Sequence, residues 1–153
     1  MTQTRYMSSK IRMMMRAAGL AALVAIVMAG CRKWSHNGDL DGQWQVMQVT
    51  YSGVPVDFPE GERFYYDFYL NTFQLGFTDM RPTWLRGNFV YDESRLALDF
   101  PYIKEGRLSA EWTERLVYWG VPDSGEMDMH IRTLDGKTLV MEYDDVVITC
   151  RKF

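Results

Sequence analysis

Apolar and polar residues alternate with a period of two along most of the chain beyond residue 40, and helical periodicity is rare there. Glu126–Thr133 is the clearest case: Met127, Met129 and Ile131 fall on one face, and charged or ionisable residues fall on the other. A strand with one buried and one solvated side has this pattern. This part of the chain is therefore predicted to be built of antiparallel strands.

A hairpin follows this strand. Asp135-Gly136 is a strong turn signal because both residue types tolerate positive φ. The return strand places Leu139, Met141 and Tyr143 on one face, and after a turn the chain ends with a further strand over residues 146–153.

The first half of the chain alternates in the same way, which gives about eight strands in meander order. In the opening strand, Trp44 and Val46 share one parity, whereas Met47, Val49 and Tyr51 share the other, which predicts a bulge. Because eight antiparallel strands with open edges would invite aggregation, we expect them to close into a barrel. The predicted fold is therefore an all-β, eight-stranded antiparallel up-and-down barrel with one short helix.

The one break in the strand pattern is Pro101–Gly125. Ser109 is placed to cap a short helix that runs to about Tyr118, in which charged residues interleave with Trp112 and Trp119. We expect this crossover to lie against the barrel.

The N-terminal region has a different composition. Met1–Arg16 is basic, and Ala17–Met28 is an uncharged apolar run too short to span a bilayer, which together are typical of a signal peptide and its helix. Met28-Ala29-Gly30-Cys31 resembles the lipobox of bacterial lipoproteins. The resemblance implies cleavage after Gly30 and acylation of Cys31 with fatty chains such as palmitate, several of which hold a protein on a membrane.

These features divide the chain into a lipoprotein signal peptide (1–30), a tether (31–39) and a barrel domain (40–153). No acid directly follows Cys31, and we therefore expect an outer-membrane lipoprotein facing the periplasm, with the cell surface as the alternative.

Leu40-Asp41-Gly42-Gln43-Trp44, at the start of the first strand, resembles the G-x-W signature of lipocalins and of lipocalin-like domains in bacterial lipoproteins. The final segment, LDGKTLVMEYDD followed by ITCRKF, is similar to the last hairpin of those domains. The resemblance implies that Gly42 turns the chain under the barrel and that Trp44 plugs its closed end. It also implies that Arg151 lies across the Trp44 ring, a contact worth about 0.5–2 kcal/mol.

Charge and residue chemistry exclude several functions. The chain has 17 basic and 20 acidic residues; four basic residues and no acid lie in the first 30, which leaves 13 basic against 20 acidic, a net charge of −7. So acidic a domain disfavours nucleic acid as a partner.

No catalytic constellation, cofactor motif or metal-ligand spacing involves His36 or His130, and the protein is expected not to be an enzyme. Cys150 is expected to be a buried thiol. Met127, Met129 and Met141, with Met47, fit either core packing or a Cu(I) site.

Apolar side chains on the inward faces are expected to line the barrel interior: Phe64, Tyr66, Phe68, Phe73, Phe77, Phe89, Leu98, Met129 and Met141. If they leave a cavity, they bind a small hydrophobic ligand that enters at the end formed by Ser52–Gly61 and Asp79–Gly87. If they fill the barrel, the protein is a non-catalytic interaction or inhibitor protein that docks an envelope protein. A sugar-binding module is the third alternative, with Tyr65, Tyr69, Trp84 and Trp112 as a stacking platform.

Overall fold

The computed structural model describes residues 36–78 and 85–153. The predicted signal peptide, the lipobox-like residues that end at Cys31, and Trp84 therefore lie outside the described residues. None of the helices in the described ranges is long and apolar enough to cross a membrane.

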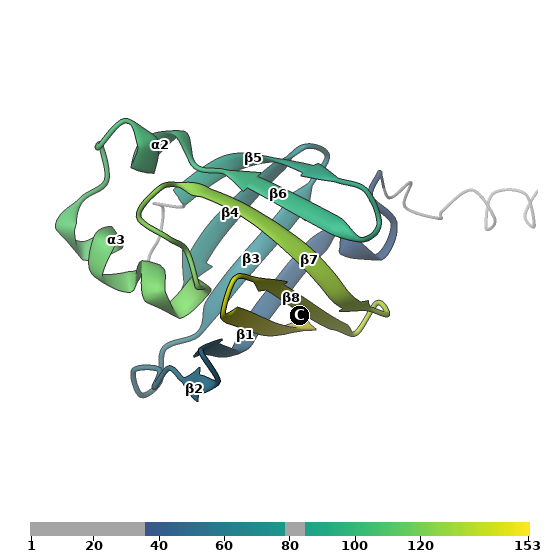
Figure 1. The fold of residues 1–153 in the computed structure, drawn as a ribbon, viewed down its shortest axis with the longest axis horizontal. Coiled ribbons are helices and arrows are strands. Elements are labelled where there is room, and N and C mark those ends of the chain that lie inside the picture. The colour runs from purple at the N-terminus through teal and green to yellow at the C-terminus, as the bar shows by residue number, and fades with distance from the viewer. Residues whose placement is uncertain (1–35, 79–84) are drawn as a thin grey trace, which may run out of the picture. The chain divides into compact units, whose positions relative to one another are not determined.

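The strands form one antiparallel sheet that closes on itself (Figure 1). Each strand pairs with its neighbour in sequence, except for the short β2, and β1 pairs with β9 to complete the ring. The predicted eight-stranded barrel is confirmed, and β2 is a two-residue addition on the edge of β1. The strands are β1 (Gly42–Tyr51), β2 (Val54–Pro55), β3 (Phe64–Tyr69), β4 (Thr72–Phe77), β5 (Leu85–Tyr91), β6 (Arg95–Asp99), β7 (Glu126–Leu134), β8 (Thr138–Tyr143) and β9 (Val146–Lys152).

The bulge predicted in the first strand is present. The register between β1 and β9 shifts between Val46 and Gln48, and the Met47 side chain at the shift is 45% exposed. Because the extra residue restores the inward parity, both Val46 and Val49 are buried on either side of it.

The interior of the barrel is packed with aromatic rings. Tyr66 and Phe68 stack with ring centroids 5.7 Å apart, and Phe68 meets Phe89 edge-on at 5.3 Å. The Tyr66 hydroxyl is fully buried and donates a hydrogen bond to the Trp119 carbonyl at 2.6 Å, so its polar atom costs little. Each such ring contributes about 1.5–3 kcal/mol by leaving water.

Trp44, near the start of β1, is fully buried in the core. Its indole Nε1 donates to the Leu40 carbonyl at 2.7 Å, within the 3-10 turn η1 (Gly38–Leu40). The main-chain N–H of His36 donates to Asp41 Oδ2 at 2.8 Å. The last residues of the predicted tether are thus hydrogen-bonded to the residue that precedes β1.

The cation over the Trp44 ring is Lys152, and the expectation that Arg151 would lie there is wrong. Lys152 Nζ lies 4.3 Å from the ring centroid and donates to the main-chain carbonyl of Asp39 at 2.9 Å. The Arg151 guanidinium instead donates to Gln45 Oε1 on the outer face. The reason is the period of the strand: Trp44 pairs directly with Lys152, so Arg151 points to the opposite side.

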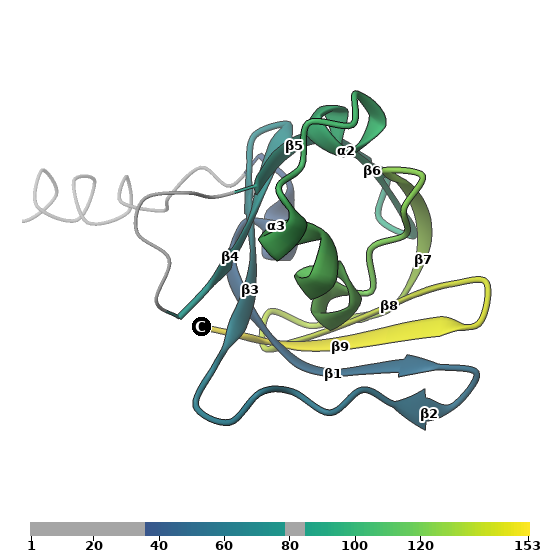
Figure 2. The same cartoon turned by 90° about the vertical axis from the view of Figure 1, so that its left-hand side faces the viewer.

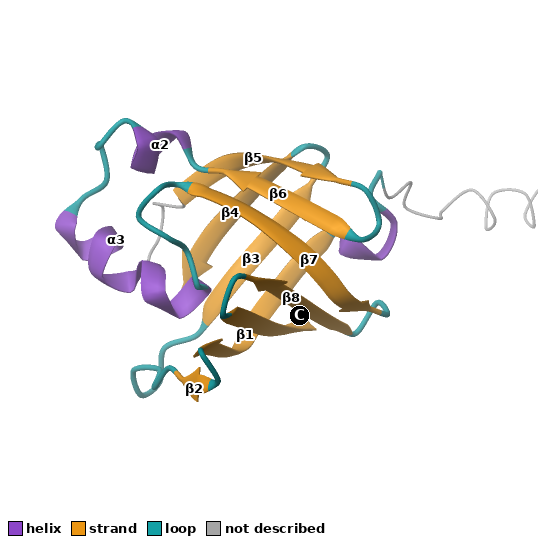
Figure 3. Cartoon of the chain, in the orientation of Figure 1, coloured by secondary structure: helices purple, strands orange, loops and turns teal. Residues whose placement is uncertain are grey.

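The crossover between β6 and β7 contains the predicted helix and one further helical turn (Figure 3). These elements are α2 (Pro101–Lys104), α3 (Ala110–Arg115) and the 3-10 helix η2 (Leu116–Trp119). Ser109 is the N-cap residue of α3 but makes no side-chain capping bond; its carbonyl accepts the Thr113 N–H at 3.0 Å. Viewed along the barrel, α3 lies across one end of it (Figure 2).

Candidate functional site

The crossover seals the mouth of the barrel. Trp119 is fully buried there, edge-on to Phe64 at 4.9 Å and stacked on Trp112 at 5.6 Å. Its indole Nε1 donates to the Tyr65 carbonyl at 3.0 Å, which fixes the ring to the barrel wall. A ligand cannot enter along the barrel axis while Trp119 occupies this place.

A half-buried ion pair fastens the crossover to the segment before β3. Arg115 pairs with Glu62, with 24% and 26% of their side chains exposed, and its guanidinium lies 4.5 Å from the centre of the Phe77 ring. The Tyr143 hydroxyl of β8 donates to the Gly120 carbonyl, directly after η2, at 2.5 Å. The crossover also contacts the segment Ser52–Gly61, where an entrance was expected, through Tyr118 and Phe58 at 5.9 Å; most of the other expected segment, Asp79–Gly87, lies outside the described residues.

All nine residues expected to line an interior cavity are buried, and most of them pack against one another or against the crossover. Phe73, for example, meets Phe100 at 4.7 Å, and Met129 and Met141 are fully buried in the same core. Of the nine, Phe89 and Leu98 also line a pocket on the flank of the barrel.

This flank pocket has a volume of about 780 Å³ and lies against β5, β6 and β7. Three cross-strand rows of residues line it, and crossover residues and the turn after β8 border it. The rows are Asn88, Asp99 and Glu126; Phe89, Leu98 and Met127; and Val90, Ala97 and Asp128. The remaining lining residues are Lys104, Pro122, Ser124, Tyr143 and Asp144.

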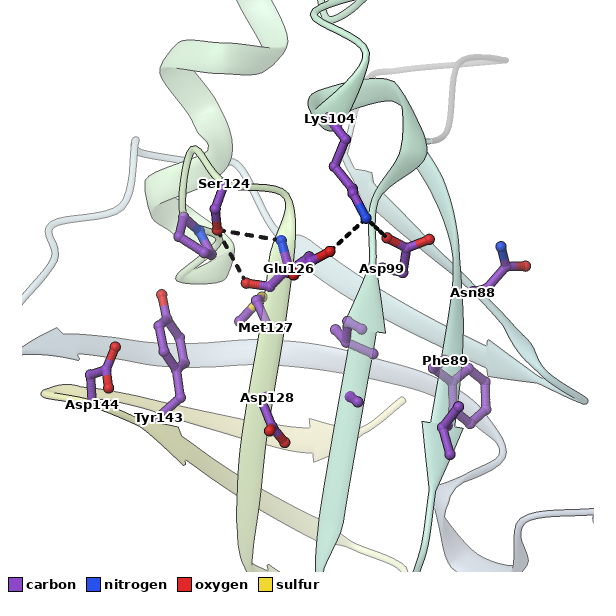
Figure 4. A pocket seen from close by; sticks show the side chains of 14 residues that line it. Asn88, Phe89, Asp99, Lys104, Ser124, Glu126, Met127, Asp128, Tyr143 and Asp144 are labelled. Carbon is purple, nitrogen blue, oxygen red and sulfur yellow. Dashed lines mark hydrogen bonds and ion pairs between the residues drawn. The ribbon is translucent and has the colours of Figure 1, made fainter.

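Lys104 at the end of α2 connects two of these strands across the pocket (Figure 4). Its Nζ lies 2.5 Å from Glu126 Oε1 and 3.0 Å from Asp99 Oδ1. These two hydrogen bonds, that to Glu126 first, raise the pKa of Lys104, so the amine is charged at neutral pH. The Ser124 hydroxyl donates to the main-chain carbonyl of Glu126 at 3.3 Å.

Two further groups define the electrostatics of the pocket. Arg95 on β6 makes a two-pronged pair with Asp128, which lowers the pKa of that carboxyl through hydrogen bonding and charge. Burial raises the pKa of the Tyr143 phenol, which therefore stays protonated and keeps its bond to the Gly120 carbonyl.

The stacking platform considered for a sugar is not formed as expected. Trp112 is buried against Trp119, and Tyr65 contacts the Phe153 ring at 5.3 Å. Trp112 therefore offers no exposed face beside Tyr65.

The other candidate groups occupy structural positions. Cys150 is buried, and burial raises the pKa of its thiol, which keeps it unreactive. Met47 is exposed at the bulge, whereas Met127, Met129 and Met141 are buried in the core, so the four do not form one thioether site. Within residues 36–78 and 85–153, no three His, Cys, Asp or Glu residues are placed to hold a metal ion.

The flank pocket could not be found from the alternation of residues. The pattern places Asp99 and Glu126 on outer faces, but only the pairing of β6 with β7 brings them together. Lys104 comes five residues after Asp99, the last residue of β6. This short separation is the one local signal that its side chain reaches the end of β6.

A closed barrel with a crossover of this kind is the architecture of a ligand-binding module. Residues 26–153 match the family described as the lipocalin-like domain, and the chain belongs to that family. A solved structure of a lipocalin-like protein from Bacteroides uniformis is similar, with 23% identity, a TM-score of 0.56, and coverage of 76% of this chain and 100% of that one. An uncharacterized protein from Bacteroides eggerthii is also similar, with 18% identity, a TM-score of 0.58, and coverage of 74% and 98%. At these identities the two structures establish the fold alone. Comparison with curated protein sequences finds no match.

Proposed function

We propose that this protein is a non-catalytic binding protein of the bacterial cell envelope that takes a small, mainly apolar molecule into its flank pocket. The observation that carries the proposal is the pocket itself. Its volume of about 780 Å³ lies within the roughly 300–1,000 Å³ typical of small-molecule sites. Val90 and Ala97 offer apolar surface in its lining, and polar groups surround them.

The absence of a catalytic role is supported by how the polar groups of the pocket are used. The amine of Lys104 is held between two carboxylates, Arg95 holds Asp128, and the Ser124 hydroxyl bonds a main-chain carbonyl. These contacts position side chains relative to one another, as expected for a binding site with a fixed shape.

The envelope location rests on the lipobox-like residues that end at Cys31, in a segment outside the described residues. A fatty-acid label should be incorporated into the wild-type chain in its host and not into Cys31→Ser. Equal incorporation into both chains would refute lipidation at this residue.

Native mass spectrometry of the protein purified gently from its host tests ligand binding. We expect a co-purified small molecule on the wild type. Ala97→Trp, which fills the centre of the pocket, should abolish it. Ala110→Trp, an exposed position on α3 outside the lining, is the matched control and should retain the bound molecule.

A second function is favoured by one observation, the packed interior of the barrel. A filled barrel provides a rigid scaffold for docking an envelope protein through its outer surface, where Tyr69 and Val90 are exposed. A wild-type protein that carries no small molecule in the same mass spectra would refute the pocket function and support this one.

A further inference from the structure

The segment that leads from the proposed lipid anchor reaches the barrel beside one particular turn. The main-chain N–H of His36 donates to Asp41 Oδ2 at 2.8 Å, and the side-chain amide of Asn37 donates to the Leu70 carbonyl at 2.7 Å. Leu70 lies in the two-residue turn between β3 and β4. The place where the tether joins the fold is therefore fixed, and the β3–β4 turn is part of it.

This junction lies at one end of the barrel. Because neighbouring strands are antiparallel, the start of β1 shares that end with the turns β3–β4, β5–β6 and β7–β8, and we call it the tether end. The crossover follows β6 and lies at the other end.

The tether is short compared with the barrel. Five residue steps join Cys31 to His36, and an extended chain covers at most about 3.3–3.6 Å per residue, or about 18 Å in all. The ten residues of β1 alone extend over about 33 Å. A barrel anchored through Cys31 therefore keeps its tether end near the membrane and cannot stand on its crossover.

The β3–β4 turn is the apolar turn of the tether end. Tyr69 is 62% exposed and Leu70 is 48% exposed, and residues 68–78 include no charged side chain. The other two turns carry the charged residues Asp92, Glu93, Asp135 and Lys137. Tyrosine and leucine are favoured where protein meets lipid, whereas charges are favoured in water. The β3–β4 turn is thus the part of this end suited to contact lipid.

The backbone of Leu70 is an independent sign that its side chain serves a partner. Its φ is 57°, in the left-handed region that favours glycine and strains a bulky residue. A two-residue hairpin loop usually has glycine or asparagine where φ is positive. Because about half of the Leu70 surface is exposed, packing in the core does not account for this strain. Strained residues of this kind cluster where the side chain has a function.

From these observations we infer that the β3–β4 turn contacts the membrane surface, with Tyr69 and Leu70 among the lipid headgroups. The inference rests on the lipid anchor of the proposed function and adds the orientation of the anchored barrel. The flank pocket is bordered by Lys104, Pro122 and Ser124 of the crossover, so in this orientation it lies away from the lipid.

An environment-sensitive fluorescent label at position 70 tests the contact. Leu70→Cys carries nitrobenzoxadiazole, and Tyr102→Cys is the matched control, because Tyr102 is 46% exposed and belongs to the crossover. Burial keeps Cys150 from reacting with the label, and acylation occupies Cys31. The lipidated protein is purified from its host and added to preformed vesicles of phosphatidylethanolamine and phosphatidylglycerol.

On vesicles, we expect the emission of the label at position 70 to shift to the blue and its reduction by dithionite to be several-fold slower than at position 102. Equal emission and equal reduction rates at the two positions of vesicle-bound protein would overturn the lipid contact and leave the anchor standing. Protein that does not bind the vesicles would overturn the anchor itself. A label at position 70 that responds in intact envelopes and not on vesicles would overturn the lipid contact and assign the turn to a protein partner.

Leu70→Gly separates a role in folding from a role at the membrane. Glycine adopts a φ of 57° without strain, so the variant should unfold at the same urea concentration as its parent or a higher one. The comparison is made in the Cys31→Ser chain, which carries no lipid. A clearly lower midpoint would show that the leucine supports the fold and would overturn the argument from its strain.

Discussion

Replacing Trp119 with alanine tests whether the crossover is part of the barrel core. The side chain is fully buried, and burial of an aromatic ring of this size removes about 150–250 Å² from water, which is about 4–6 kcal/mol at 25 cal/mol per Å². Loss of the hydrogen bond from Nε1 to the Tyr65 carbonyl adds about 0.5–1.5 kcal/mol. Partial collapse of the surroundings offsets some of this, and tryptophan-to-alanine changes in cores typically cost about 3–5 kcal/mol. We therefore expect Trp119→Ala to lower the free energy of unfolding by about 4 kcal/mol.

Urea unfolding followed by circular dichroism measures this change. The control is Tyr102→Ala, because Tyr102 is an aromatic residue of the same crossover with 46% of its surface exposed, and its loss should cost under about 1 kcal/mol. If Trp119→Ala cost no more than the control, the crossover would be a loosely attached lid and the sealed mouth described above would be wrong.

Three further changes have definite expected outcomes. Lys152→Met should lower the free energy of unfolding by about 1–3 kcal/mol, because it removes the cation over Trp44 and the hydrogen bond to the Asp39 carbonyl. An unchanged urea midpoint would contradict this role of Lys152. Asp135 accepts main-chain N–H bonds that lower the pKa of its carboxyl, so its charge stabilises the fold above the unfolded pKa of about 3.9 and this contribution is lost as pH falls through the lowered value. Asp135→Asn should therefore be less stable than wild type at pH 7, and thermal melts at lower pH should show the difference shrink as pH falls below the unfolded pKa. Gly87→Ala should cost about 1–3 kcal/mol or prevent folding, since the added Cβ would lie 2.2 Å from the Asp99 carbonyl oxygen; wild-type thermal stability would contradict this contact.

The strands could be predicted from the sequence because a half-buried strand places apolar residues at every second position, on the face that points to the core. Glu126–Thr133 shows this alternation without interruption, and the structure buries Met127, Met129 and Ile131 as expected. The bulge at Met47 was also visible, because it changes the parity of the apolar residues. The same alternation also indicates which cation lies over the Trp44 ring. Lys152 shares the parity of buried Cys150, and Arg151 does not.

The binding site was less predictable for a physical reason. Inward-facing aromatic residues such as Phe64 and Phe77 have the same sequence pattern whether they surround a cavity or a packed core. Only the positions of Trp112 and Trp119 relative to the barrel decide between these states, and those positions depend on the path of the crossover. The flank pocket depends in turn on the register between strands, which a single strand does not record.

The pairing of β1 with β9 joins the first strand of the barrel to its last strand, Val146–Lys152. During synthesis, a chain that has reached only residue 145 exposes the unpaired edges of β1 and β8, and no local rearrangement can cover both. The ring can close only once β9 has left the ribosome, so closure joins strands about 100 residues apart and carries a large loop-closure cost. Until then the nascent chain requires protection from edge-to-edge association, and a deletion that removes β9 would leave both edges unpaired.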